Sequence, residues 1–203
     1  MSQKTRRQRE REARRRAILE AAVEVLSERG PEGASMKAIA DRAELSKGLL
    51  YYYFEDRQRL YREAALLVVE RFFQDLDDHL PPEAPLPELL EAYLRFTLDR
   101  FRTDRLMLRV VADYMGHAAP RSGRDGAMRR SHGPWLERSL RALRGTPWAD
   151  DPSGFQAFVF DATVVLKDLC LAGRDHEAER RIAFWTDLVR RAAACPDAPR
   201  SRR

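Results

Sequence analysis

The chain has 203 residues, of which 44% are hydrophobic, and a formal net charge of +5, so it is long enough for one large domain or two small ones with a sizeable core. Cys170 and Cys195 are widely separated and form no CxxC pattern, which argues against a disulfide framework and against a zinc site. The sequence contains no run of about 20 apolar residues that could span a membrane, and its N-terminus has no apolar stretch that could act as a signal peptide. We therefore expect a soluble cytoplasmic protein with no membrane partner. We also expect no metal and no cofactor.

Most of the positive charge lies at the start of the sequence. Residues 1–16 carry eight basic side chains against Glu10 and Glu12, a net charge of +6, whereas the remaining residues sum to −1. Such a segment is typical of an arm that binds a polyanion. The alternative is a solvated, disordered terminus that has no partner.

The first predicted helix begins at Arg14, in the stretch "RRRAILEAAVEVLSERG". Its apolar residues Ile18, Ala22, Val25 and Leu26 have the spacing of a single helical face. The helix is expected to stop at Gly30-Pro31, because glycine and proline together favour a helix end.

Two short helices follow. Ser35 is a candidate N-cap for "MKAIADRA", and Ser46 is one for "KGLLYYYF", in which Leu50 and Phe54 form the inward i, i+4 pair. A fourth helix begins at Arg57, after the capping residue Asp56, and runs to about Leu80. Two short helices joined by a tight turn and braced by longer ones predict a helix-turn-helix unit.

The three consecutive tyrosines of the third helix cannot all enter one core, because successive side chains on a helix point about 100° apart. If Leu50 faces inward, the opposite face presents Gly48 and Tyr52, flanked by Leu49 and by Tyr51 and Tyr53. That face would be aromatic, nearly uncharged and exposed. The alternative is that Tyr51 and Tyr53 pack against the neighbouring helices.

The second half of the sequence also predicts helices. A proline-rich stretch at 80–88 is followed by helical patterns at 89–101, 104–117, 128–145, 154–173 and 177–194, so the fold class is all-α. The last two are long, and each is strongly apolar on one side. The tail at 196–203 is expected to be disordered.

The first 65 residues resemble the TetR family of bacterial transcriptional regulators. The matching pattern follows "ILEAAVEVLSERG" and comprises Ala40, Ala43, Leu45, Ser46, Gly48, Leu50, Tyr51, Tyr53, Phe54, Arg57 and Leu60. One departure is Glu44, where the family usually has glycine in the turn. A residue with φ > 0 at that position would be strained.

The resemblance implies an N-terminal three-helix DNA-binding domain followed by a helical ligand-binding and dimerisation domain. We expect a basic arm at 1–16, a helix-turn-helix domain at 17–62, and an effector-binding and dimerisation domain at 63–195. The function implied is a ligand-responsive repressor that binds a palindromic DNA operator as a homodimer and is released by a small-molecule effector. Activation instead of repression stays open.

The residues expected to contact DNA lie on the second and third helices and at the start of the fourth. They are Lys37, Ser46, Lys47, Gly48, Leu49, Tyr51, Tyr52, Tyr53 and Arg57. Leu49 stands where the family more often has threonine, serine or alanine, and it would favour a thymine methyl group. The arm would lie along the phosphate backbone or enter a minor groove. The alternative for the lysines is a solvated surface.

Two sets of residues are expected to act in the second half. The candidate effector pocket comprises Phe72, Tyr93, Phe96, Met107, Tyr114 and Trp135. The candidate dimer interface, a four-helix bundle made by the last two helices and their symmetry mates, comprises Phe158, Ala162, Val165, Leu166, Leu169, Ile182, Trp185, Leu188 and Val189. For both sets the alternative is plain monomer core.

Two rival functions are weaker. An enzyme would have to use His79, His117, His132 or His176, and none of these has the spacing of a metal site or a catalytic triad. A basic protein that binds nucleic acid or an anionic membrane without sequence preference would use the arm alone. That second alternative leaves the exposed tyrosines of the third helix without a role.

Overall fold

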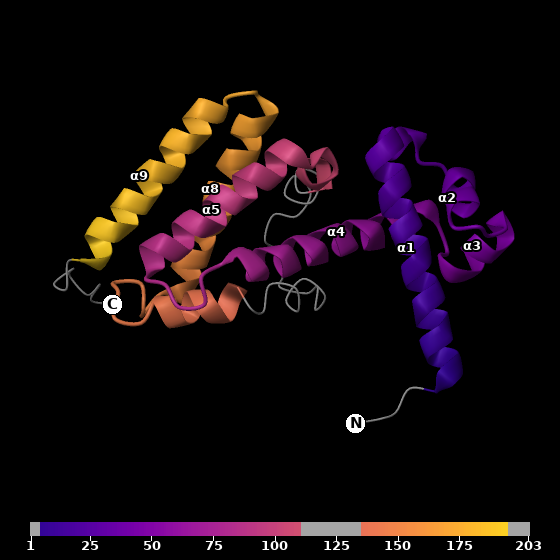
Figure 1. Ribbon diagram of the computed structural model, residues 1–203, viewed down its shortest axis with the longest axis horizontal. Coiled ribbons are helices and arrows are strands. Elements are labelled where there is room, and N and C mark those ends of the chain that lie inside the picture. Colours follow the sequence, from indigo (N-terminus) through magenta and orange to yellow (C-terminus); the bar gives the residue numbers. More distant parts are fainter. Residues whose placement is uncertain (1–4, 111–134, 195–203) are drawn as a thin grey trace. The chain divides into compact units, whose positions relative to one another are not determined.

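The computed structural model of the protein describes residues 5–110 and 135–194, and within these ranges it contains helices and no strand. The helices are α1 (Arg6–Gly33), α2 (Met36–Arg42), α3 (Lys47–Tyr53), α4 (Arg57–His79), α5 (Leu86–Thr103), α8 (Pro152–Leu171) and α9 (Asp175–Ala193), with further helical residues at 105–110 and 135–142 (Figure 1). The predicted all-α fold is confirmed. Among the described helices, none has the apolar stretch of about 18 residues that a membrane span needs.

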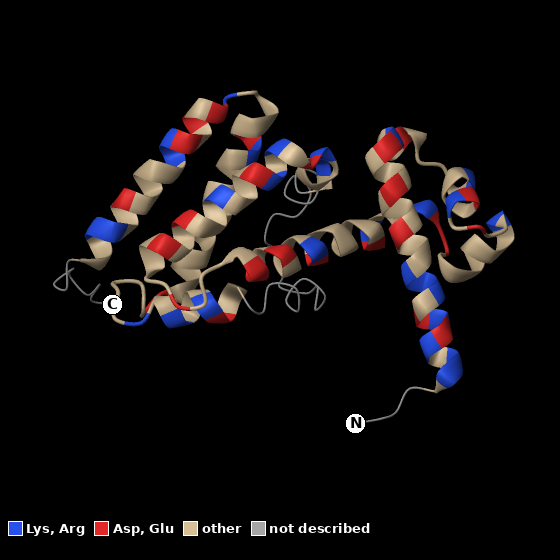
Figure 2. Ribbon diagram, in the orientation of Figure 1, with Lys and Arg blue, Asp and Glu red and all other residues tan. Residues whose placement is uncertain are grey.

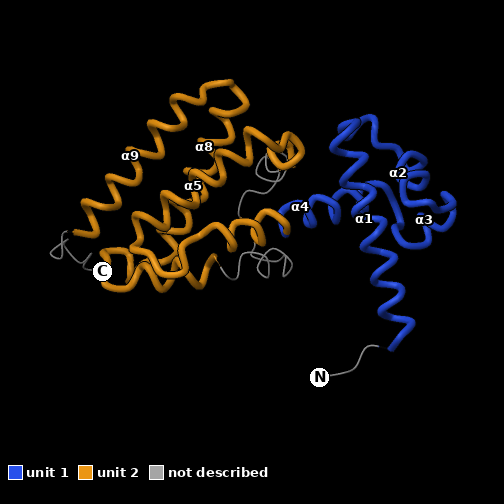
Figure 3. The backbone as a smooth tube through the Cα atoms, viewed as in Figure 1, with its two compact units in different colours: residues 1–70 blue, residues 71–203 orange. Residues whose placement is uncertain are grey.

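The chain divides into two compact units, Met1–Glu70 and Arg71–Arg203 (Figure 3). The division falls inside α4, and so does the boundary expected between residues 62 and 63. No glycine or proline interrupts Arg57–His79, so the sequence has no linker at which one unit would end and the other begin. α4 stops before Leu80, where the consecutive Pro81 and Pro82 cannot continue a helix.

α1 begins at Arg6 rather than at Arg14. Thr5 accepts a hydrogen bond from the backbone N–H of Gln8, and the Gln8 side chain in turn accepts one, at 2.9 Å, from the backbone N–H of Thr5. This is a capping box, which satisfies two of the backbone donors that a helix start leaves unpaired. The signal T-x-x-Q stands at positions 5–8 of the sequence, so most of the basic arm is the first part of a helix.

The other end of α1 has the break that its sequence predicts. Gly30 has φ 69° and ψ 175°, which are not helical dihedral angles, and Pro31 follows it before a last turn to Gly33. Glycine adopts a positive φ at little cost. The regular part of the helix therefore ends at Arg29.

The core of unit 1 joins α1, α2, α3 and the start of α4. The predicted stripe of α1 is buried, and so are the inward residues of the short helices, although Ala43 is only half-buried. The fully buried side chains are Ile18, Ala22, Val25, Ala34, Ile39, Leu50, Phe54, Leu60 and Ala64. This small core fixes α3 against the other helices of its own unit.

Unit 2 is built on α5, α8 and α9, which contact one another, and Figure 1 shows α8 and α9 as neighbouring helices joined by a tight turn. Their buried side chains include Leu90, Leu94, Phe101, Phe155, Leu166 and Ile182. Charged side chains connect the surfaces of α5 and α9: Arg95 and Arg102 both pair with Glu179, at 3.0 and 2.9 Å. Because these side chains are largely exposed, we attribute the packing of unit 2 mainly to apolar burial.

Candidate nucleic-acid interface

The two short helices of unit 1 begin at serine N-caps. The Ser35 hydroxyl accepts a hydrogen bond from the Ala38 N–H at 3.1 Å, and the Ser46 hydroxyl accepts one from the Leu49 N–H at 3.2 Å. Each bond satisfies one of the free donors in the first turn, and a serine cap typically contributes about 1 kcal/mol. Both predicted caps are confirmed.

The turn between α2 and α3 contains the single strained residue that the sequence predicts. Glu44 has φ 55° and is the one non-glycine residue with a positive φ in the described part of the chain. The turn is closed by the Leu45 N–H, which donates to the Ala40 carbonyl oxygen at 2.9 Å. The bond holds α2 and α3 in their relative orientation. The positive φ that the turn requires strains the backbone of Glu44, because this residue has a Cβ atom.

α3 divides into a buried and an exposed face. Leu50 and the following Phe54 are fully buried, as predicted, whereas Leu49, Tyr51 and Tyr52 are 40%, 44% and 66% exposed. A Cβ atom added at Gly48 would meet no atom of the chain within 4 Å, so internal packing does not require a glycine there. α3 therefore presents an aromatic surface that includes a bare patch of backbone.

Cations lie beside this aromatic surface. The guanidinium of Arg11, on α1, lies 5.7 Å from the ring centroid of Tyr52, and the ammonium of Lys47 lies 5.9 Å from that of Tyr51. The ring of Tyr53, which is half-buried, stands edge-on to Tyr52 with centroids 5.3 Å apart. Cations at such distances are attracted to the negative faces of the rings. The exposed face of α3 and the basic segment of α1 thus belong to one surface of unit 1. Figure 2 shows the Lys and Arg residues of that segment along the first turns of α1.

Several of the expected contact residues are free to meet a partner. Lys37 and Lys47 are exposed, and neither forms an ion pair with another described residue. The Ser46 hydroxyl already accepts the capping bond, which leaves its O–H to donate elsewhere.

Arg57 has partners within the chain, which the sequence did not reveal. Its guanidinium donates to the Pro31 carbonyl oxygen and lies 4.8 Å from the ring centroid of Tyr61, whose hydroxyl donates to the same carbonyl at 3.2 Å. The N-terminus of α4 also has an anion already, because the Asp56 carboxylate accepts a bond from the Arg59 N–H at 2.6 Å. A role for Arg57 in phosphate binding stays a prediction.

Two arginines that the sequence did not single out hold the unit together. Arg42, at the end of α2, pairs with Glu24 at 2.8 Å and with Glu28 at 2.7 Å, both on α1. The hydrogen bond from Arg42 lowers the pKa of Glu28, so this carboxylate stays charged to a lower pH than usual. Arg15 pairs with Glu63 and lies 4.6 Å from the ring centroid of Phe54. Their partners lie far away in the sequence, so no local spacing marks these residues.

The candidate effector residues of unit 2 are placed as two aromatic pairs. Tyr93 stacks on Trp135 with centroids 4.4 Å apart, and Phe72 lies 5.4 Å from Phe96. Phe72, Tyr93 and Met107 are buried, and Phe96 and Trp135 are half-buried. Tyr114, the remaining candidate, lies outside the described residues.

Tyr93 is a polar group within this apolar region. Its hydroxyl lies 3.2 Å from the Thr163 hydroxyl, and burial raises the pKa of Tyr93 above its usual value. The phenol therefore stays neutral at physiological pH. Its hydroxyl can donate or accept a hydrogen bond, either with Thr163 or with a bound molecule.

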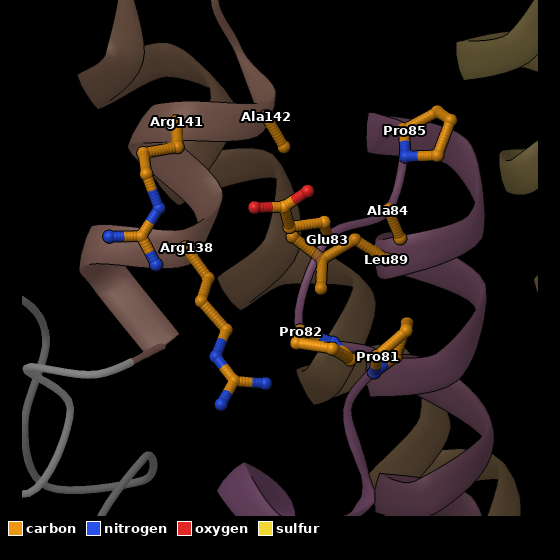
Figure 4. A pocket seen from close by; sticks show the side chains of 9 residues that line it. All are labelled: Pro81, Pro82, Glu83, Ala84, Pro85, Leu89, Arg138, Arg141 and Ala142. Carbon is orange, nitrogen blue, oxygen red and sulfur yellow. The ribbon is translucent and has the colours of Figure 1, made fainter.

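A cavity of about 400 Å³ lies elsewhere in unit 2. In Figure 4, Arg138 and Arg141 stand on one side of it and the loop with Pro81, Pro82 and Glu83 on the other. Arg138 is already paired with Asp77 at 2.8 Å and donates to the Leu80 carbonyl oxygen at 3.0 Å. None of the five candidate effector residues that the structure describes lines this cavity.

Most of the expected dimer interface is buried within the single chain. Six of its nine residues are buried inside the chain, where they cannot meet a second copy: Ala162, Leu166, Leu169, Ile182, Trp185 and Val189. Phe158 and Val165 are half-buried, and Leu188 is 49% exposed. The apolar stripes of α8 and α9 are thus mainly the core of unit 2. The sequence missed Phe184, which is 61% exposed one turn before Leu188, and Leu171, which is 55% exposed at the end of α8.

Other expectations rest on residues that the structure does not describe. The tail at 196–203 and Cys195 lie outside the described ranges, as do His117 and His132. Within 5–110 and 135–194, no group of three or more metal-ligating side chains comes together. Cys170 is half-buried, and burial raises the pKa of its thiol, which makes it a poor nucleophile.

An N-terminal unit in which a capped short helix exposes an uncharged aromatic face, followed by a second helical unit, defines a regulator of the helix-turn-helix class. The comparisons with known proteins agree. The family model "Bacterial regulatory proteins, tetR family" matches residues 18–64, from the buried part of α1 to the first turns of α4. These findings support the TetR family of bacterial transcriptional regulators for this chain, and the homologues that it matches are transcriptional regulators, which are not enzymes.

Individual relatives support this assignment. The HTH-type transcriptional regulator PksA of Bacillus subtilis (strain 168) is 42% identical over 85 residues, which cover 39% of this chain and 42% of PksA. The chain spans about half the length of the curated relatives it matches.

Solved structures share the fold over most of the chain. A TetR-family transcriptional regulator of Pectobacterium atrosepticum covers 93% of this chain and 97% of its own, with a TM-score of 0.69 and 20% identity. The multidrug binding protein EbrR, in complex with imidazole, covers 87% and 94%, with a TM-score of 0.55 and 22% identity. At these identities the likeness concerns the fold alone.

Proposed function

We propose that the protein is a sequence-specific DNA-binding regulator of transcription, which inserts α3 into the major groove of a palindromic operator as a homodimer. The observation that carries the proposal is the exposed face of α3, with Leu49, Tyr51 and Tyr52 turned to solvent around the bare backbone of Gly48. Exposed apolar side chains that cluster in this way typically mark an interaction site. The major groove of B-DNA is wide enough to admit one α-helix.

Each residue of that face has a role consistent with its chemistry. Gly48 allows the backbone to approach the DNA closely. Leu49 has no polar atom in its side chain and would contact a thymine methyl group. The hydroxyls of Tyr51 and Tyr52 would donate to phosphates, and such contacts position the protein without reading the sequence.

The remaining proposed contacts surround the face of α3. The ammonium groups of Lys37 and Lys47 would bind phosphates or guanine, and the Ser46 hydroxyl would donate to a phosphate. Tyr53 supports the ring of Tyr52 from the side. Arg57 would join them only by exchanging its bond to Pro31 for a phosphate.

The proposal is tested by selecting bound duplexes from a random DNA pool and titrating the selected sequence at several salt concentrations. We expect a palindromic sequence that is bound far more tightly than its scrambled version. Tyr52→Ala should weaken operator binding by about tenfold, a typical loss for one good contact. Leu140→Ala is the matched control, since Leu140 is also exposed but lies in unit 2, outside the proposed binding surfaces. If no sequence is enriched while binding stays salt-dependent, the protein is a nonspecific nucleic-acid-binding protein.

We propose that the homodimer forms through the outer faces of α8 and α9. Support comes from Phe184 and Leu188, which lie one turn apart on α9 and are both strongly exposed. They would pack on their symmetry mates as part of a four-helix bundle. The double variant Phe184→Arg, Leu188→Arg should sediment as a folded monomer with the helical content of the wild type. An intact dimer would refute this interface.

We further propose that unit 2 binds a small-molecule effector and that binding releases the operator, as in a repressor confined to the cytoplasm with its DNA. The paired aromatics Tyr93, Trp135, Phe72 and Phe96 offer a large apolar surface with one neutral hydroxyl. An effector shifts operator affinity only by its different affinity for the two states, typically by 5- to 150-fold. A compound library screened by thermal shift, with Tyr93→Ala as the comparison, would identify ligands whose stabilising effect requires this region.

A further inference from the structure

The basic segment that precedes the helix-turn-helix is helical, and its arginines lie on two opposite faces. Because successive residues on a helix are rotated by about 100°, Arg7 and Arg14 fall within about 60° of Arg11. Arg6, Arg9 and Arg16 fall within about 40° of the opposite direction. Arg15 lies about 40° from Arg11 on the same side, but it is half-buried and paired with Glu63. The other arginines form a near face (Arg7, Arg11, Arg14) and a far face (Arg6, Arg9, Arg16).

The near face adjoins the exposed surface of α3. The guanidinium of Arg11 lies against the ring of Tyr52, the most exposed aromatic residue of α3. One turn further along α1, Arg15 pairs with Glu63 and covers the ring of Phe54. These contacts all lie inside unit 1, so the direction of the near face is fixed relative to α3.

The two faces differ in their ion pairs. On the far face two of the three arginines are paired, Arg6 with Glu10 at 2.7 Å and Arg16 with Glu20 at 3.4 Å, whereas no ion pair connects Arg9 to another described residue. The near-face arginines are exposed, and no ion pair connects them to another residue of the described chain. Their charges are therefore available to an external anion.

We propose that the near face of α1 is a preformed phosphate-binding track that extends the DNA footprint beyond the sequence read by α3. The proposal rests on the proposed function of α3 in binding DNA. A helix with its side chains is about 10–12 Å wide, whereas the minor groove is about 6 Å wide, so this segment binds along the sugar-phosphate backbone and does not enter that groove.

The length of the track sets the size of the effect. From Arg7 to Arg14 the helix rises by about 10 Å, which corresponds to roughly three base pairs on each side of the operator. Three phosphate contacts per subunit should contribute about 2.7 to the slope of log affinity against log salt, which makes roughly 5 in a dimer.

Two triple variants test the proposal, because each removes three positive charges from the same segment. The near-face variant Arg7→Ala, Arg11→Ala, Arg14→Ala should flatten the salt slope by roughly 5 and shorten the footprint by about three base pairs on each side. The far-face variant Arg6→Ala, Arg9→Ala, Arg16→Ala should change both much less. Equal losses in the two variants would overturn the proposal in favour of an unstructured polycation, and so would the absence of a loss in both.

A third variant separates helical order from charge. Ala13→Pro keeps every arginine but breaks the helix within the segment, since proline removes one backbone hydrogen bond and clashes with the preceding turn. Ala13 is exposed, so the core of unit 1 should stay intact, as circular dichroism and the unfolding midpoint would verify. We expect a loss close to that of the near-face variant. Unchanged binding would show that no preformed track is needed.

The failure of this proposal can be told apart from a failure of the proposed function. Preference for the operator over scrambled DNA reports on α3 and should survive in all three variants. If the wild-type protein itself shows no preference, the role of α3 is wrong whatever the arginines do. If the preference holds but the two faces lose equally, only the track is wrong.

Discussion

The two units of the chain expose their large apolar side chains differently. In unit 1 three of them, Leu49, Tyr51 and Tyr52, lie on the seven-residue helix α3, whereas in unit 2 they are dispersed over residues 135–142, α8 and α9. A concentration on one short helix has no explanation in the packing of unit 1. Exposed residues that stand singly are ordinary on any protein surface. We therefore infer a binding surface on α3 from its exposed residues directly, whereas in unit 2 the inference depends on the pair Phe184 and Leu188.

The largest expected effect distinguishes core from surface on α9. Trp185→Ala should lower the free energy of unfolding by about 3–5 kcal/mol, since it empties a buried site. The adjacent Phe184→Ala should leave the core intact and act only on dimerisation. In the wild type the urea midpoint should rise with protein concentration, and in Phe184→Ala this dependence should weaken. A small effect of Trp185→Ala would return that residue to the dimer interface.

The same contrast can be made on α3. Leu50→Ala should cost about 2–5 kcal/mol, because the side chain is fully buried. The adjacent Leu49→Ala should change stability by no more than about 0.5 kcal/mol and should instead alter the preferred operator at a thymine position. Urea unfolding measures the first effect, and selection from a random DNA pool measures the second. Similar stability losses in the two variants would argue that both faces of α3 are core.

These pairs of neighbours also show what the sequence could and could not predict. In unit 1 the capping residues and the inward pair Leu50 and Phe54 follow from local rules, and the structure has them. The strain at Glu44 was implied by the family resemblance, and Glu44 has the positive φ. An apolar stripe indicates burial but does not say what covers it. The stripe with Ile182 and Trp185 is therefore equally consistent with a dimer interface and with the core of its own unit, and the structure buries it within that unit.

The missed features of unit 1 have a different cause. The apolar stripe predicts a start of α1 at Arg14, which is too late, because the helix begins with a charged segment that is capped by Thr5 and Gln8. The ion pair of Arg42 with Glu28 connects residues that are distant in the sequence. Only the fold brings them together, so no spacing rule could have found them.

A pH-dependent effect tests the buried polar group of unit 2, which has no counterpart among the exposed apolar residues of unit 1. Burial raises the pKa of Tyr93 in the folded state, so its contribution is complete below about pH 10, the usual pKa of tyrosine, and is lost as the pH rises through the folded-state pKa. Tyr93→Phe should remove a slope of up to about 1.4 kcal/mol per pH unit above pH 10. Unfolding free energies measured across this range would contradict the assignment if Tyr93→Phe kept the slope of the wild type.

The smallest expected effect concerns the turn in front of α3. Glu44 holds φ 55°, and a glycine at this position would remove the clash of Cβ at a small cost in chain entropy. Glu44→Gly should therefore raise the free energy of unfolding by about 1 kcal/mol, whereas Glu44→Ala keeps the strain and should give no gain. A glycine that left the stability unchanged would mean that the Glu44 side chain offsets the strain through interactions of its own. Because the turn orients α3, a gain in stability with unchanged operator affinity would show that the strain is not needed for DNA binding. A gain accompanied by weaker binding would mean that the strained turn fixes α3 more rigidly than a glycine can.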